Sequence, residues 1–87
     1  MRINFAHVNI QGINCAVFGA KPLSPTEAAH EELLADLVQR ARANNLRVDK
    51  AALAYAHGRQ IKYWGHRDLA QFLANNGPPR WTHSLDV

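Results

Sequence analysis

The clearest hydrophobic pattern in the chain is an apolar stripe at helical spacing within residues 24–45. Leucine, valine and alanine recur there three or four residues apart, and charged residues fall between them, which is typical of an amphipathic helix. The stripe consists of Ala29, Leu33, Leu34, Leu37, Val38 and Ala41. Ser24, Pro25 and Glu27 provide a helix start, because serine caps the first turn, proline suits the first helical position and glutamate completes a capping box. The sequence therefore predicts a long helix over residues 24–45.

Residues 2–18 alternate between apolar and polar positions, as paired strands do. Gln11-Gly12 is a tight-turn signal in the middle of this stretch, because glycine accepts positive φ. With a two-residue loop, one face collects the pairs Ile10 with Ile13, Val8 with Cys15 and Ala6 with Val17. The other face collects Asn9 with Asn14, His7 with Ala16 and Phe5 with Phe18. We expect the long helix to cover the first face and the second face to stay open.

A second hairpin is predicted over residues 50–64, around His57-Gly58-Arg59. A three-residue loop places Leu53 opposite Tyr63 and Tyr55 opposite Ile61. This register separates the larger apolar side chains from the polar ones most cleanly between the two faces. The stretch 50–56 is rich in alanine, so a helix is the alternative for that segment.

A shorter helix over residues 66–76 follows, and Asn75-Asn76-Gly77 with the next two prolines ends it. Residues 78–87 alternate loosely, which fits either a last short strand or an ordered tail. Residues 1–87 thus form a single α+β domain in the order ββαββα. Its simplest arrangement has two layers, with one long and one short helix packed on one face of a four-stranded antiparallel sheet.

Charge is distributed unevenly along the 87 residues, whose net charge is +3. Residues 1–39 carry a net charge of −2, whereas residues 40–87 carry +5 and hold five of the seven aromatic side chains. Basic residues interleaved with aromatic ones favour an acidic partner, either a protein surface or a nucleic acid. The alternative is that the positive charge only maintains solubility.

This half of the chain supplies the candidate binding residues. They are Arg59, Lys62, Trp64, Arg67, Arg80 and Trp81. The open sheet face supplies a second candidate set, namely Phe5, His7, Asn9, Asn14 and Phe18. Trp81 follows two prolines near the end of the chain, so it either plugs the edge of the core or anchors a partner.

No common catalytic constellation occurs in the chain. Cys15 faces inward in the expected register, where a thiol is inert. The five histidines have no standard metal-ligand spacing, and His30 is expected on the exposed side of the long helix. We therefore expect no enzyme, metal or cofactor. The leading hypothesis is a non-catalytic module that engages a macromolecular partner, either a protein or a protein–nucleic acid complex, through the basic, aromatic C-terminal half and the open sheet face. The alternative is a nucleic-acid-binding regulator, and the third is a small enzyme with a non-standard histidine-containing site.

Neither a membrane-spanning stretch nor a signal peptide is recognisable, and one cysteine suits a reducing compartment, so we expect a cytoplasmic protein. An exposed edge of the sheet makes a homodimer a further expectation. In its small size and its lack of catalytic motifs, the chain resembles many accessory proteins of phages and mobile elements, including inhibitors of host defence systems. This resemblance is generic and assigns no role to any residue.

Overall fold

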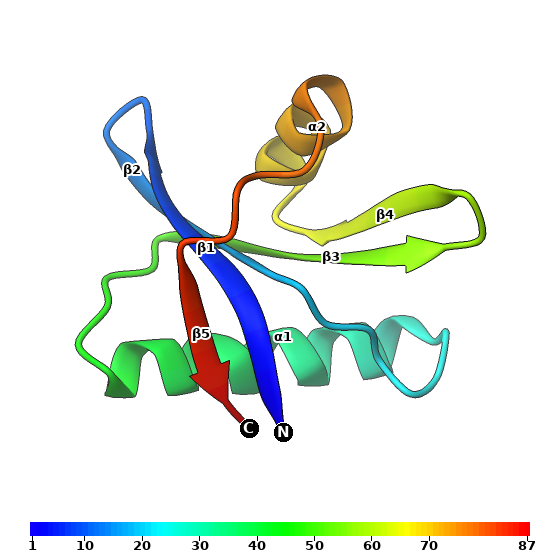
Figure 1. Ribbon diagram of the computed structural model, residues 1–87, viewed down its shortest axis with the longest axis horizontal. Coiled ribbons are helices and arrows are strands. Elements are labelled where there is room, and N and C mark those ends of the chain that lie inside the picture. The colour runs from blue at the N-terminus through cyan, green and yellow to red at the C-terminus, as the bar shows by residue number, and fades with distance from the viewer.

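One five-stranded sheet lies at the centre of the computed structural model, which describes residues 1–87 (Figure 1). The elements are β1 (Arg2–Ile10), β2 (Ile13–Phe18), α1 (Glu27–Ala43), β3 (Lys50–His57), β4 (Gln60–Gly65), α2 (Arg67–Asn76) and β5 (His83–Asp86). The strand order is β4-β3-β2-β1-β5. The predicted α+β class is confirmed, but the sheet has five strands instead of four, because residues 83–86 form the strand β5 on β1.

The first hairpin has the predicted register. Ile10 pairs with Ile13 and Val8 with Cys15 across a two-residue loop. Gln11 and Gly12 both have positive φ, at 54° and 82°, which is the geometry of the hairpin turn that matches the twist of the strands.

The sheet is mixed, and the prediction of a purely antiparallel sheet is wrong. β2 and β3 are parallel neighbours, whereas the other three pairs are antiparallel. The helix α1 connects β2 to β3 and carries the chain back along the sheet, so that β3 starts at the same end as β2. A parallel pair requires such a crossover.

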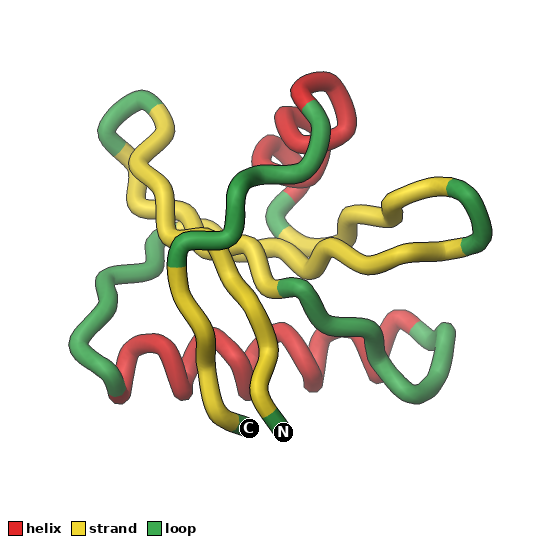
Figure 2. The backbone as a smooth tube through the Cα atoms, in the orientation of Figure 1, coloured by secondary structure: helices red, strands yellow, loops and turns green.

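The two helices cover opposite faces of the sheet, so the predicted two-layer packing is also wrong (Figure 1). α1 packs through Leu37 and Ala41 on the face that holds Phe5 and Phe18, so the prediction that the long helix covers the face of Val8 and Cys15 is wrong. α2 packs through its leucines on the face that holds Cys15. The reason is that β1 and β2 carry apolar side chains on both faces, and each face needs its own cover. Figure 2 shows the resulting three layers, with helices in red on either side of the strands.

The second hairpin consists of strands, so the helical alternative for residues 50–56 does not occur. Its loop is Gly58-Arg59, and Leu53 pairs with Trp64 instead of Tyr63. The predicted register is therefore shifted by one residue. In the observed register, the indole of Trp64 lies on the α1 side of the sheet, beside the helix.

α1 begins three residues later than predicted. The N-cap is Thr26, whose Oγ1 accepts a hydrogen bond from the backbone N–H of Ala29 at 3.1 Å. Ser24 and Pro25 precede the helix, which ends at Ala43. Thr26 provides the capping hydroxyl in place of Ser24, because in the folded chain its Oγ1 reaches a free N–H of the first turn. The short helix α2 lies within its predicted range and spans Arg67–Asn76.

The cap gives a direct test of where α1 begins. Thr26→Ala should lower the free energy of unfolding by about 1 kcal/mol, because it removes the acceptor for the Ala29 N–H. Ser24→Ala is the matched control and should change that free energy by only a few tenths of a kcal/mol, roughly the scatter of a surface substitution. Urea unfolding followed by circular dichroism measures both. An equal loss in the two variants would contradict the assignment of the cap.

Gly65 ends β4 where the backbone passes close to β3. A Cβ atom there would lie 2.4 Å from the carbonyl oxygen of Ala51 and 2.6 Å from the Cα of Ala52, and φ is +153°. Gly65→Ala should therefore cost more than about 2 kcal/mol of unfolding free energy. Gly58→Ala is the control, because Gly58 has a positive φ of 63° but open space around it. It should cost about 1 kcal/mol.

Candidate functional site

The structure separates the six predicted binding residues into distinct regions. Lys62 and Trp64 lie on β4 and point to the α1 side of the sheet, since they pair with Tyr55 and Leu53. Arg59 lies in the loop between β3 and β4. The remaining three, Arg67, Arg80 and Trp81, lie at the start of α2 and in the segment between α2 and β5. The six basic and aromatic residues therefore come from several different parts of the fold.

Trp81 combines the two alternatives that the sequence suggested, because it packs against the edge of the core and also keeps exposed apolar surface. Its ring lies against the backbone at Gly19, where a Cβ would meet two ring atoms at 3.2 Å. The side chain is nevertheless 39% exposed. It borders a shallow cavity of about 330 Å³ together with Pro78 and Ile61. Trp81 thus packs against the backbone at Gly19 and also exposes apolar surface to solvent.

The sheet face that was expected to be open is covered by α1 at Phe5 and Phe18, so the prediction of an open face is wrong there, whereas Asn9 near the end of β1 is exposed. Phe5 and Phe18 are buried beneath α1 with their rings 5.5 Å apart. His7 lies within 2.7 Å of the Arg47 carbonyl through Nε2. Asn9 accepts the Gly12 N–H in the first hairpin turn. These side chains are used for packing and for loop connections inside the fold.

Asn14 also connects two parts of the fold. Its backbone N–H donates to the Asp49 carboxylate at 3.2 Å, and the Asp49 N–H donates to the Asn14 carbonyl at 2.8 Å. The hydrogen bond from Asn14, helped by the charge of Arg47, holds the pKa of Asp49 below its ordinary value of 3.8. This pair fixes the start of β3 to β2.

β4 is the exposed edge of the sheet, and its hydrogen-bonding direction can be determined. The backbone N–H of His66 donates to the carbonyl of Ala51 on β3 at 3.0 Å. Because alternate residues of an antiparallel pair bond inward, the even-numbered residues of β4 bond to β3. Ile61, Tyr63 and Gly65 therefore direct their N–H and C=O groups outward, where no strand pairs with them.

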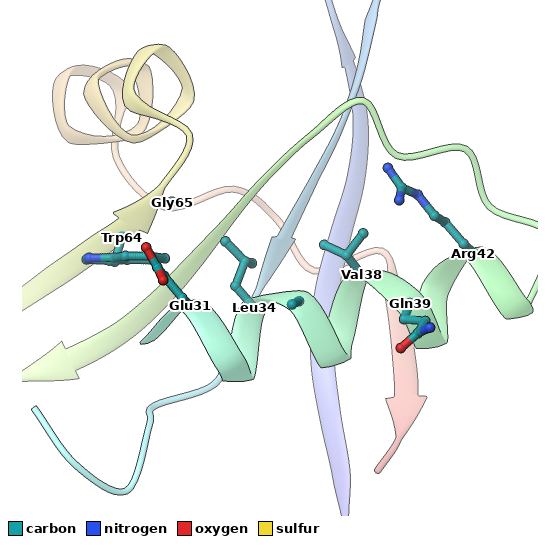
Figure 3. A pocket seen from close by; sticks show the side chains of 8 residues that line it. Glu31, Leu34, Val38, Gln39, Arg42, Trp64 and Gly65 are labelled. Atoms are coloured by element: carbon teal, nitrogen blue, oxygen red, sulfur yellow. The ribbon is translucent and has the colours of Figure 1, made fainter. Parts of the chain in front are cut away.

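A groove lies between this edge and α1 (Figure 3). Its volume is about 800 Å³. The lining side chains of α1 are Glu31, Leu34, Ala35, Val38, Gln39 and Arg42, and β4 contributes Trp64 and Gly65. Glu31 lies at the same end of the groove as Trp64, and Arg42 lies at the other end. Eleven residues of helix separate the two charges, which corresponds to about 16 Å. The groove is apolar in the middle and oppositely charged at its ends.

Trp64 is held in place by His30, which the sequence analysis expected on the exposed side of α1. His30 is only 2% exposed, and its ring centroid lies 5.3 Å from that of Trp64. Nδ1 is 2.7 Å from the Thr26 carbonyl and Nε2 is 2.6 Å from the Tyr55 hydroxyl. A carbonyl only accepts, so Nδ1 carries the hydrogen and Nε2 accepts from Tyr55. The signal for burial was present, because His30 lies seven residues before the buried Leu37 on the same stripe.

The other chemically active side chains form no additional cluster. Cys15 is buried, as predicted, and burial raises the pKa of its thiol, while the charge of Lys50 acts less strongly in the opposite direction. None of the five best-defined cavities is lined by His7, His57 or His66. No three His, Cys, Asp or Glu side chains converge closely enough to hold a metal ion.

Neither helix has the length and apolar character required to cross a membrane. Comparison with protein-family models, with curated proteins and with solved structures gives no match to the chain. The candidate site therefore rests on its own geometry, which is the outward edge of β4 and the groove beside it.

The low pKa of Asp49 predicts part of the response to acid. Folding lowers the pKa of this carboxyl group, so the ionised group stabilises the fold fully at pH values above its ordinary pKa of 3.8. This contribution is lost as the pH falls through the lowered pKa. Asp49→Asn should therefore lower the stability at neutral pH and make the loss of stability in acid less steep. Urea unfolding at a series of acid pH values measures this slope. Identical slopes for the variant and the wild type would contradict the role of Asp49.

Proposed function

We propose that the protein is a small non-catalytic binding module that engages a partner protein at the edge of β4. The observation that carries this proposal is the coincidence of an unpaired strand with the largest groove of the molecule. Outward backbone groups on β4 give a partner strand hydrogen bonds, and an adjacent groove gives its side chains a place to bind. This combination is how domains bind extended segments by adding a strand to a sheet.

The side chains of the bound segment would alternate between the two faces of the sheet. Those on the α1 side would enter the groove and contact Leu34, Val38 and Trp64. Glu31 and Arg42 would select opposite charges at the two ends, and this would favour one direction of the segment. On the other face, Ile61 is 45% exposed and offers a further apolar contact.

Two features support β4 as the binding edge over the opposite edge. β5 has four residues, and only Leu85 among them is buried. The groove beside β4 is also much larger than the cavity of about 330 Å³ near β5.

Proline substitution tests the edge without removing a side-chain charge. Tyr63→Pro removes an outward N–H and leaves the β3–β4 hydrogen bonds intact, so it should reduce capture of the partner at least tenfold. Ser84→Pro is the matched control on the opposite edge, because the pairing of Val87 with Met1 places the Ser84 N–H outward as well. Capture from an extract of the native cell, quantified by mass spectrometry, measures both.

The extract should be divided and one half treated with nuclease. Unchanged capture after this treatment supports a protein partner, and its loss supports the nucleic-acid alternative. Circular dichroism shows whether each variant is folded. If folded Tyr63→Pro and Ser84→Pro variants captured the same partner as the wild type, the β4 edge would not be the binding surface.

A further inference from the structure

The edge of β4 is poorly protected against pairing with a copy of itself. Exposed edges usually carry prolines, bulges or inward-pointing charges that prevent such pairing. β4 contains one lysine, Lys62, and no proline, and its pairing with β3 is continuous over six residues from Gln60 to Gly65. Resting on the proposed function, we infer that the partner strand at this edge is β4 of a second copy of this chain, paired antiparallel about a two-fold axis centred on Tyr63.

The position of the axis follows from the alternation of side chains. Residues opposite each other in a sheet point to the same face. The two-fold axis must therefore lie between one residue and the same residue of the second copy, and not at the level between two consecutive residues. Within β4, axes at Lys62 and at Tyr63 pair the longest stretches, which are residues 60–64 and 61–65. An axis at Lys62 would place two ammonium groups directly opposite each other, which is unfavourable.

An axis at Tyr63 gives complementary contacts on both faces. On the α1 side, Lys62 of each copy lies opposite Trp64 of the other copy, next to Glu31. Neither Lys62 nor Glu31 has an ion-pair partner within the chain. A lysine over an indole beside a carboxylate combines a cation–π contact with an ion pair. On the other side, Ile61 lies opposite Gly65, whose lack of a side chain leaves space for it.

The outward backbone groups are also satisfied in this register. Tyr63 pairs with Tyr63 of the second copy, and Ile61 pairs with Gly65 in both directions. These are the three residues of β4 whose N–H and C=O groups point outward. The two sheets join into one continuous sheet, and the end of each groove beside Trp64 receives the lysine of the other copy.

A cysteine test reports the register directly. Opposed residues of a hydrogen-bonded pair have Cα atoms about 5.5 Å apart, which suits a disulfide. Tyr63→Cys should therefore give a covalent dimer under mild oxidation. Lys62→Cys is the control, because two positions 62 lie diagonally, about 7–8 Å apart, and should not be joined. Cys15 is buried and takes no part. Non-reducing electrophoresis and circular dichroism measure cross-linking and folding.

A charge exchange tests the side-chain contacts in the native edge. Lys62→Glu and Glu31→Lys should each raise the dimer dissociation constant about tenfold, because each change occurs twice in a two-fold dimer. The double variant should return to within about threefold of the wild type, as expected for a directly coupled pair. Glu32→Lys makes the same charge change as Glu31→Lys at the neighbouring position of α1, in a cavity that holds no β4 residue, and should have little effect. Sedimentation equilibrium measures the constants.

Each result either supports or overturns this inference. Cross-linking at position 63 alone, with restoration by the charge exchange, supports the dimer centred on Tyr63. A monomer at every concentration up to the solubility limit overturns it. If that monomer still captured another protein through an edge that Tyr63→Pro blocks, the proposed function would hold and only the identity of the partner would be wrong. A dimer that is not cross-linked through position 63, and whose dissociation constant does not change with the charge exchange, has its interface elsewhere and overturns the inference.

Discussion

The central constraint on this fold is that β2 is buried on both of its faces. Cys15 and Val17 lie on the α2 side, and Ala16 and Phe18 lie on the α1 side. A strand with apolar side chains on both faces must have a cover on each, and 87 residues supply two helices for this purpose. β2 therefore lies in the middle of the sheet, with β1 and β3 on either side. The three-layer arrangement follows from this one strand.

The same constraint leaves the two outer strands with different degrees of exposure. At one edge, β5 is a strand of only four residues that pairs with β1 and brings the two chain ends side by side (Figure 2). At the other edge, β4 extends past the area that α1 covers. Trp64 is only half-buried because α1 lies to one side of it, and the space that remains is the groove. The proposed binding edge is thus a consequence of covering the centre of the sheet with short elements.

Much of the local structure could be predicted from the sequence, because local contrast between side chains determines it. The first hairpin has its predicted register since an error of one residue would mix Val8 and Cys15 with polar partners. The second hairpin lacks this contrast. Alanines occupy half of β3, and a shift of one residue changes the pairing of Leu53 from Tyr63 to Trp64 with little difference in pattern. The sequence could not distinguish between these registers.

The layer arrangement and the groove depend on tertiary contacts that no local pattern encodes. Both faces of the first hairpin offer apolar side chains to α1, and the helix packs on the face that holds Phe5 and Phe18. Lys62 and Trp64 were recognised as binding candidates by their charge and size. The α1 side chains opposite them, such as Leu34, were recognised only as core residues of the helix stripe. A groove formed by two elements becomes visible only after these elements are placed together.

His30 explains how an exposed edge can remain ordered while it is unoccupied. An unpaired strand loses the hydrogen bonds of one side and is held mainly by its single neighbour and by packing. Here the imidazole joins the start of α1 at the Thr26 carbonyl to the Tyr55 hydroxyl of β3 and packs at a tilt against the ring of Trp64 of β4. Three elements therefore meet at one buried polar group with both of its nitrogens satisfied. Because this contact fixes the indole in the protein alone, binding at the proposed edge would require little additional ordering of Trp64, and less of the binding free energy would be lost to conformational entropy.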